Sequence, residues 1–185
     1  MISLVIPHMP SPEADAALDR CLESFKGQYD ELMLVVNDGM GYGPAVNTGL
    51  KYSTGDFIVV SNNDIELLEG SLRYMESAMG FIIPTIEPEP RDYKPRSIFG
   101  MARWVYEKLA PHGNFYDDRF KMGYFEDDDL IVRATIAQIP MLQQVGVTVK
   151  HLNGGGLTMK KVGEQYWFDI NQKVFNDKWS QDTYS

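Results

Sequence analysis

Three polar residues, Asn62, Asn63 and Asp64, follow directly after a short apolar run and could together bind a cation or a phosphorylated ligand. The run from Phe57 to Val60 is rich in β-branched residues, which predicts a buried strand. In open α/β sheets, ligands bind at the carboxyl ends of strands. Magnesium and similar hard cations take oxygen ligands from one or two protein groups and complete their shell with substrate phosphates. The alternative interpretation is an ordinary turn, because Asn and Asp favour turns.

Four consecutive carboxylates, Glu126 to Asp129, precede an apolar pattern of helical period. Acidic residues favour the first turn of a helix because of the helix dipole, but four of them repel one another. Crowded carboxylates raise one another's pKa, which suits a general base. Asp129 and Arg133 have i, i+4 spacing and are expected to pair. Glu126 and Asp127 therefore remain as the candidates for acid–base chemistry.

A third candidate is His151, which ends an apolar run and is soon followed by Gly154-Gly155-Gly156. Imidazole is a common metal ligand, and glycines let the backbone approach a ligand closely. A structural role for this histidine stays open on these grounds, and His8 is expected to be structural.

The glycine-rich turn from Gly39 to Gly43 fits neither of two common nucleotide-binding motifs. It lacks the third glycine of a dinucleotide fingerprint, since Pro44 or Val46 occupies that place. It also lacks the Gly-Lys-Ser/Thr ending of a phosphate-binding P-loop. Dehydrogenase and P-loop functions are therefore not expected.

Composition sets broader limits on the protein. The 185 residues are most simply one domain, and a net charge of −9 argues against a broad nucleic-acid surface. The single cysteine, Cys21, is expected in the core and permits no intrachain disulfide. No run approaches the ~20 apolar residues of a membrane span and no signal peptide is evident, so a cytoplasmic location is expected.

The elements that would position these residues alternate along the chain. Apolar runs predict strands over Ile2–Ile6, Leu32–Val36, Phe57–Val60, Phe81–Pro84 and Leu142–Lys150. Helical spacing predicts helices over 12–25, 45–52, Glu69–Met79, Ala102–Leu109, Asp127–Ala137 and Gln165–Trp179. This order predicts an α/β fold with a mostly parallel sheet covered by helices on both faces. The proline-rich segment Thr85–Arg96 is expected to be a loop.

The order of these signals resembles glycosyltransferase family 2, the nucleotide-sugar enzymes of the GT-A fold, from Ser3 to about Trp179. The resemblance rests on Val5-Ile6-Pro7, on 34–39, on 43–49 with its Asn-x-Gly element, on 61–64 as a variant of Asp-x-Asp, on Glu126-Asp127, on His151, and on Asn171, Phe175, Lys178 and Trp179. It implies a compact viral or bacterial member with one GT-A domain over 1–185. Residues 1–64 would form the nucleotide-binding half, and residues 65–185 the acceptor and catalytic half with a C-terminal helix.

The resemblance also implies roles for particular residues. Asp127 would be the general base, with Glu126 as the second candidate. Asp64 and His151, assisted by Asn62, would hold Mn²⁺ or Mg²⁺. The nucleotide-sugar would be bound by Pro7, Asp38, Asn47, Asn62 and Asn63. One departure is that Asn62 stands where the metal motif has its first aspartate, and an amide is a poorer ligand.

The implied reaction is an inverting, metal-dependent transfer of a hexosyl or related sugar. The donor would be UDP-, dTDP- or GDP-linked, and the acceptor a hydroxyl of a glycan, a protein or a modified nucleobase. Acceptor choice would lie in the variable segments Thr85–Ser97 and Gly154–Glu164. A non-catalytic nucleotide-sugar or glycan-binding module and a sugar nucleotidyltransferase are the alternatives, and the oligomeric state is open.

Taken together, these expectations require residues 64, 127 and 151 to share one cleft.

Overall fold

The computed structural model describes residues 1–88, 94–152 and 164–180. Its strands are β1 (Ile2–His8), β2 (Glu31–Val36), β3 (Phe57–Ser61), β4 (Ile65–Glu69), β5 (Phe81–Glu87), β6 (Ile98–Ala102) and β7 (Met141–His151). Its helices are α1 (Pro12–Ser24), α2 (Tyr42–Tyr52), the 3-10 helix η1 (Leu72–Met75), α3 (Arg103–Leu109), α4 (Glu126–Ile136) and α6 (Glu164–Trp179). The predicted glycine run 154–156 lies outside the described residues.

All of these strands form one sheet in the order β2-β1-β3-β6-β5-β7-β4. β1 is parallel to β2 and β3, and β5 is parallel to β7. β6 is antiparallel to both β3 and β5, and β4 is antiparallel to β7. Five strands therefore share one direction and only β4 and β6 oppose it. The carboxyl ends of β1, β2, β3 and β7 consequently lie along one edge, together with the start of β4.

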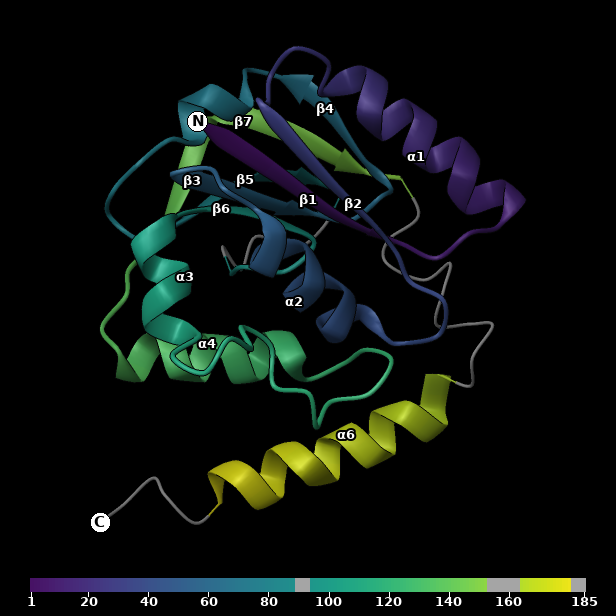
Figure 1. Ribbon diagram of the computed structural model, residues 1–185, viewed down its shortest axis with the longest axis vertical. Coiled ribbons are helices and arrows are strands. Elements are labelled where there is room, and N and C mark those ends of the chain that lie inside the picture. Colours follow the sequence, from purple (N-terminus) through teal and green to yellow (C-terminus); the bar gives the residue numbers. More distant parts are fainter. Residues whose placement is uncertain (89–93, 153–163, 181–185) are drawn as a thin grey trace.

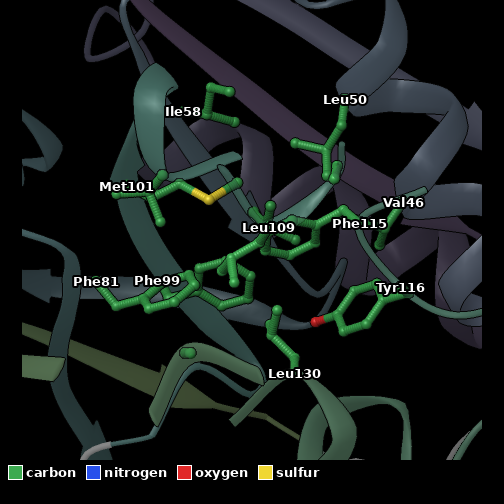
Figure 2. Packing of buried hydrophobic residues seen from close by; sticks show 14 of the residues in the cluster. Val46, Leu50, Ile58, Phe81, Phe99, Met101, Leu109, Phe115, Tyr116 and Leu130 are labelled. Carbon is green, nitrogen blue, oxygen red and sulfur yellow. The ribbon is translucent and has the colours of Figure 1, made fainter. Parts of the chain in front are cut away.

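Helices cover both faces of this sheet, as Figure 1 shows. On one face, Leu18 and Cys21 of α1 pack with apolar side chains of β1, β3, β4 and β7. On the other face, α2, α3 and α4 enclose a core that includes Phe115 and Tyr116, two residues that precede α4 (Figure 2). The predicted α/β architecture and the buried position of Cys21 are both confirmed. Over the ranges that the structure describes, no helix has the length and apolar character of a membrane span.

Helix α1 begins where the sequence predicts. Ser11 is the N-cap, and its hydroxyl accepts a hydrogen bond from the backbone N–H of Ala14 at 3.2 Å. Pro12 occupies the first helical position, where its missing N–H has no helical partner to lose. The capping residues and the apolar face of the helix both predict this start, so it can be predicted without knowledge of tertiary contacts.

The helix predicted over Glu69–Met79 is wrong. β4 runs to Glu69, and only Leu72–Met75 form a single 3-10 turn. Gly70 separates them with a φ of 88°, and a Cβ there would stand 2.1 Å from the carbonyl oxygen of Gly146. Leu72 and Met75 are both buried, so their i, i+3 spacing reflects one short turn and not a longer helix.

Two further expectations about strands need correction. β6 was not predicted, and β5 extends to Glu87, so only part of Thr85–Arg96 is a loop and residues 89–93 of it lie outside the described ranges. β6 is five residues long, and its Gly100 lies against the Phe57 ring, which weakens the apolar signal. β2, predicted as fully buried, is an edge strand in which Val36 is 55% exposed.

Candidate active site

Sheet topology brings Asp64 and His151 together. Asp64 precedes β4, and His151 ends β7, its antiparallel partner, so that Ile65 stands opposite His151. Oδ1 of Asp64 lies 3.1 Å from Nε2 of His151, and both side chains are buried. A backbone hydrogen bond from Leu152 to the carbonyl of Asp64 fixes the same crossing at 2.9 Å. Two residues that are 87 positions apart in the sequence therefore present an oxygen and a nitrogen at one point of the sheet edge.

The amides of Asn62 and Asn63 have different surroundings. The backbone N–H of Asn62 donates to the carbonyl of Ser97 at 2.7 Å, while its buried side-chain Oδ1 accepts no hydrogen bond from the part of the protein described. Burying an amide oxygen without a partner is costly, which makes it a candidate ligand atom. Nδ2 of Asn63 lies 2.8 Å from Nδ1 of His8, and Nε2 of His8 lies 2.8 Å from Asp15. His8 is thus a buried structural residue, as expected, and it positions Asn63.

Glu126 begins α4 and turns its carboxyl group into the protein. The side chain is 5% exposed, and its Oε2 has no hydrogen-bond partner among the described residues. Burial, reinforced by the negative charge of Asp127, raises the pKa of Glu126 from 4.5 to about 8. Glu126 is therefore predominantly protonated at neutral pH and can donate a hydrogen bond as well as accept one.

Asp127, next in the chain, is half-buried and is oriented by Tyr116. The Tyr116 hydroxyl donates a hydrogen bond to Oδ1 of Asp127 at 2.8 Å. Burial, followed by the charge of Asp127, raises the pKa of Tyr116 well above its usual value, so the phenol stays protonated and keeps donating. Tyr116 is itself fixed because Asn47 hydrogen-bonds to both its backbone N–H and its carbonyl, each at 2.8 Å.

The other two carboxylates of the acidic run are neutralised away from this point. Asp128 pairs with Arg96 at 3.0 Å. Asp129 is fully buried and accepts from Arg133 at 2.8 Å, which confirms the predicted i, i+4 pair, and from Lys178 at 2.5 Å. Because Asp128 and Asp129 pair with cationic side chains, Glu126 and Asp127 stay the candidates for acid–base chemistry.

Tyr42 is influenced by the charges of Asp64 and of the acidic pair. It is the first residue of α2, and its hydroxyl oxygen is buried. Burial is the main reason that its pKa stands well above the usual value, and the charges of Asp127, Glu126 and Asp64 raise it further. The negative charges of Asp64 and of the Glu126–Asp127 pair therefore all act on this one phenol.

Tyr42 and Tyr116 were not among the residues that the sequence singled out. Their rings are neighbours, with centroids 5.9 Å apart. Tyr42 could have been noticed because it opens a helix directly after the Gly39–Gly41 turn. Tyr116 lies in an irregular segment whose conformation depends on distant contacts, and no local pattern marks it.

Of the remaining predicted nucleotide-sugar residues, Pro7 and Asp38 lie toward the carboxyl ends of β1 and β2, whereas Asn47 lies within α2. Pro7 is buried in β1 opposite Val35 of β2. Asp38 is exposed just after β2, where it can meet a ligand that lies across the edge. Asn47 is buried, and its two Nδ2 hydrogens go to the Tyr116 carbonyl and to Asp118. Through these contacts Asn47 holds the backbone at Tyr116 in position.

The donor set suits a hard divalent cation. Asp64 offers a carboxylate oxygen, His151 an imidazole nitrogen, and Asn62 a buried amide oxygen that accepts no hydrogen bond from the described residues. No group of three or more His, Cys, Asp and Glu side chains gathers at metal-binding distance within 1–88, 94–152 and 164–180. Because Mg²⁺ and similar ions use few protein ligands when phosphates supply the rest, this pair with an amide fits a cation that arrives with a diphosphate.

The pKa of Glu126 leads to a stability prediction. Folded Glu126 keeps its proton to about pH 8, whereas an unfolded chain releases it near 4.5, so between these values the unfolded state binds fewer protons. The contribution of this group to stability is fully present below about pH 4.5 and is lost as the pH rises to 8 and beyond. Glutamine stays neutral throughout. We expect the stability of E126Q relative to the wild type to increase by roughly 4 kcal/mol between about pH 5 and about pH 8.5.

Urea unfolding of both proteins between about pH 5 and about pH 8.5 measures this difference. E107Q is the matched control, because Glu107 is exposed on α3. A difference between E126Q and the wild type that stays constant across this range would mean that Glu126 is ionised in the folded protein.

Comparison with solved structures identifies the fold. The chain is similar to a crystal structure of GalNAc-T7 with UDP, GalNAc and Mn²⁺, with a TM-score of 0.66 and 12% identity over 98% of this chain and 49% of that one. It is also similar to S. aureus TarS 1–349, with a TM-score of 0.59 and 10% identity over 98% of this chain and 72% of that one. The chain thus spans about half the length of the GalNAc-T7 structure. These similarities confirm the predicted GT-A glycosyltransferase fold.

Protein-family models and curated proteins give no match to this sequence.

Proposed function

We propose that this protein is a metal-dependent glycosyltransferase that moves a sugar from a nucleoside-diphosphate donor to an acceptor hydroxyl. The proposal is carried by one observation. At one end of the strands of a GT-A sheet, Asp64 and His151 lie 3.1 Å apart, and at the start of α4 the carboxylate of Asp127 accepts a hydrogen bond from Tyr116, whose ring neighbours that of Tyr42. A cation-binding end and a proton-accepting end are the two parts that sugar transfer from a diphosphate needs.

The donor end is formed by the first half of the chain together with His151. Asp64, His151 and Asn62 would hold Mn²⁺ or Mg²⁺, which acts as a Lewis acid on the departing diphosphate. Only the neutral imidazole of His151 can bind a metal. The ligating nitrogen beside Asp64 would therefore have to carry no proton. Asp38, exposed after β2, is suited to the ribose or base of the nucleotide, and Asn63 is held by His8 on the phosphate side.

The acceptor end is formed by the first turn of α4. Asp127 would take the proton of the attacking hydroxyl, with Tyr116 fixing the carboxylate through Oδ1. Attack from the side opposite the diphosphate would invert the anomeric carbon. Glu126 is protonated at neutral pH and so adds no second negative charge beside Asp127, which favours Asp127 over Glu126 as the base.

The solved relatives guide the choice of donor. GalNAc-T7 was crystallised with UDP, GalNAc and Mn²⁺, and TarS 1–349 with UDP and with UDP-GlcNAc. We therefore place UDP-linked N-acetylhexosamines before dTDP- and GDP-linked sugars as donors. The acceptor class stays as predicted, namely a glycan, a protein or a modified nucleobase with a reachable hydroxyl.

The test is a donor screen with and without Mn²⁺. We expect UDP-GlcNAc or UDP-GalNAc to raise the unfolding temperature only when Mn²⁺ is present, and UDP to be released slowly as water replaces the acceptor. Stabilisation without UDP release, even with a panel of sugar acceptors, would favour the non-catalytic binding module. Formation of a UDP-sugar from UTP and a sugar 1-phosphate, with pyrophosphate released, would favour the nucleotidyltransferase. Absence of any nucleotide effect would contradict the proposed function.

A further inference from the structure

The segment that leads into the acidic pair has an unusual backbone. Met122, Tyr124 and Phe125 all have positive φ angles, of 63°, 74° and 68°, and none of them is glycine. Such a conformation is unfavourable for residues other than glycine and persists only where the surroundings enforce it. Phe125 is the N-cap of α4, so the direction in which Glu126 and Asp127 leave the loop depends on whatever enforces this conformation.

One side chain makes most of the polar contacts to this segment. Asn171 of α6 is fully buried, and its Nδ2 donates to the carbonyls of Lys121 and Gly123 at 2.7 and 2.6 Å. Its Oδ1 accepts from the N–H of Lys121 at 3.1 Å. A single amide therefore satisfies three backbone groups of the loop from a residue 48 to 50 positions away in the sequence.

The opposite side of the loop rests on the start of α2. The backbone N–H of Tyr42 donates to the carbonyl of Met122 at 2.9 Å. A Cβ on Gly41 would stand 2.8 Å from the backbone nitrogen of Met122, so the loop and the glycine turn are in direct contact. The loop is thus held between Asn171 and the end of α2 at which Tyr42 lies.

α6 is attached to α4 at a second, separate place. Lys178 and Trp179 donate to the buried carboxylate of Asp129 at 2.5 and 3.0 Å. Phe168 and Phe175, which stand on either side of Asn171 in the sequence of α6, pack on the ring of Phe125, with centroids 5.1 and 5.6 Å away. Figure 1 shows α6 running below α4 and the loop. Because this second attachment does not involve Asn171, we expect α6 to stay bound to α4 when the amide is altered.

We propose that Asn171 is a positioning residue for the Glu126–Asp127 pair, acting through the strained 121–125 loop. It touches neither donor nor acceptor, and its role rests on the proposed function of that pair. The amide is required chemically, since two carbonyl oxygens need donors and one N–H needs an acceptor. An aspartate has the same size but offers only oxygen atoms to the two carbonyls.

The experiment compares N171A and N171D with N176A, in which an exposed asparagine on the same helix is changed. Steady-state transfer is measured together with the binding of UDP and Mn²⁺. We expect both Asn171 variants to lower kcat by roughly 10–100-fold, since a misplacement of about 1 Å can cost 100-fold. UDP affinity should stay within about twofold of the wild type, because Asp64 and His151 are held by β4 and β7. N176A should behave as the wild type.

A kcat of N171D equal to that of N176A would overturn the positioning role, and so would an equal loss of kcat and UDP affinity. If neither Asn171 variant folds, as judged by circular dichroism, Asn171 is a folding residue and the proposal is also overturned.

If the wild type itself transfers no sugar, the proposed function fails, and the role of Asn171 in holding the loop is tested by a second measurement. The pH-dependent stability difference between E126Q and its parent should shrink in an N171D background. An unchanged difference would show that Asn171 does not set the environment of Glu126.

Discussion

Replacing Asp127 with asparagine is expected to lower kcat for sugar transfer by about 100–10,000-fold, the range supplied by a general base. Asparagine keeps the size of the side chain and an oxygen that can accept from Tyr116, so the loop geometry should survive. What disappears is the basic carboxylate that would take the acceptor proton. Donor binding should change little, because the proposed cation ligands lie at Asp64 and His151.

Transfer rates and UDP affinity are measured side by side on D127N and on D19N, a control in which an exposed carboxylate of α1 is neutralised. D19N should match the wild type in both measurements. Normal turnover by D127N would remove Asp127 from the role of base. The same measurement on E126Q then separates the two candidates, because loss of activity in E126Q but not in D127N would transfer the role to Glu126.

The arrangement of the cation-binding end could be predicted only in part from sequence. Asp64 follows a buried parallel strand, and this pattern alone places it at the carboxyl edge of the sheet. Its contact with His151 depends on β4, for most of which the sequence predicted no element. β4 is short, half of it is exposed, and the helical spacing of Leu68, Leu72 and Met75 hides where it ends. The meeting of the two residues therefore followed from the family resemblance and not from strand pairing.

The acidic end shows a different limit. The run Glu126 to Asp129 predicted both the start of α4 and the Asp129–Arg133 pair, because both depend on neighbours within one turn of helix. The orientation of Asp127 depends on Tyr116, and Tyr116 depends on Asn47, 69 residues earlier. The positive φ angles at Met122, Tyr124 and Phe125 oppose local preference and exist because α2 and α6 enforce them. Local patterns contain no information about a conformation that distant contacts impose.

The negative charges of the candidate site affect how a donor and a cation would bind. The charges of three carboxylates, Asp64, Glu126 and Asp127, all raise the pKa of the buried Tyr42 phenol, and together such charges would repel a diphosphate. Protonation of Glu126 removes one of these charges, and a divalent cation at Asp64 would offset another. Donor binding and cation binding should therefore be strongly linked, more so than in a site lined with lysine and arginine.

This linkage makes Asp64 the residue whose loss should affect donor binding most. We expect D64A to lose metal-dependent UDP binding, with an affinity in Mn²⁺ that falls by on the order of 100-fold. Even the loss of a hydrogen-bond partner behind a metal ligand costs 10–100-fold, and a carboxylate ligand should matter at least as much. The substitution removes the oxygen that lies 3.1 Å from Nε2 of His151, so the remaining imidazole and amide would have to hold the cation alone.

Calorimetric titration of UDP in Mn²⁺ and in a chelator, on the wild type, D64A and D56A, measures the effect directly. Asp56 is the matched control, because it flanks the opposite end of β3 and its side chain is 91% exposed. Wild type and D56A should bind UDP tightly in Mn²⁺ and weakly in the chelator, whereas D64A should bind weakly in both. If UDP affinity in D64A still depended on Mn²⁺ as strongly as in the wild type, the cation would have to lie elsewhere. The Asp64–His151 pair would then not assist the departure of the diphosphate.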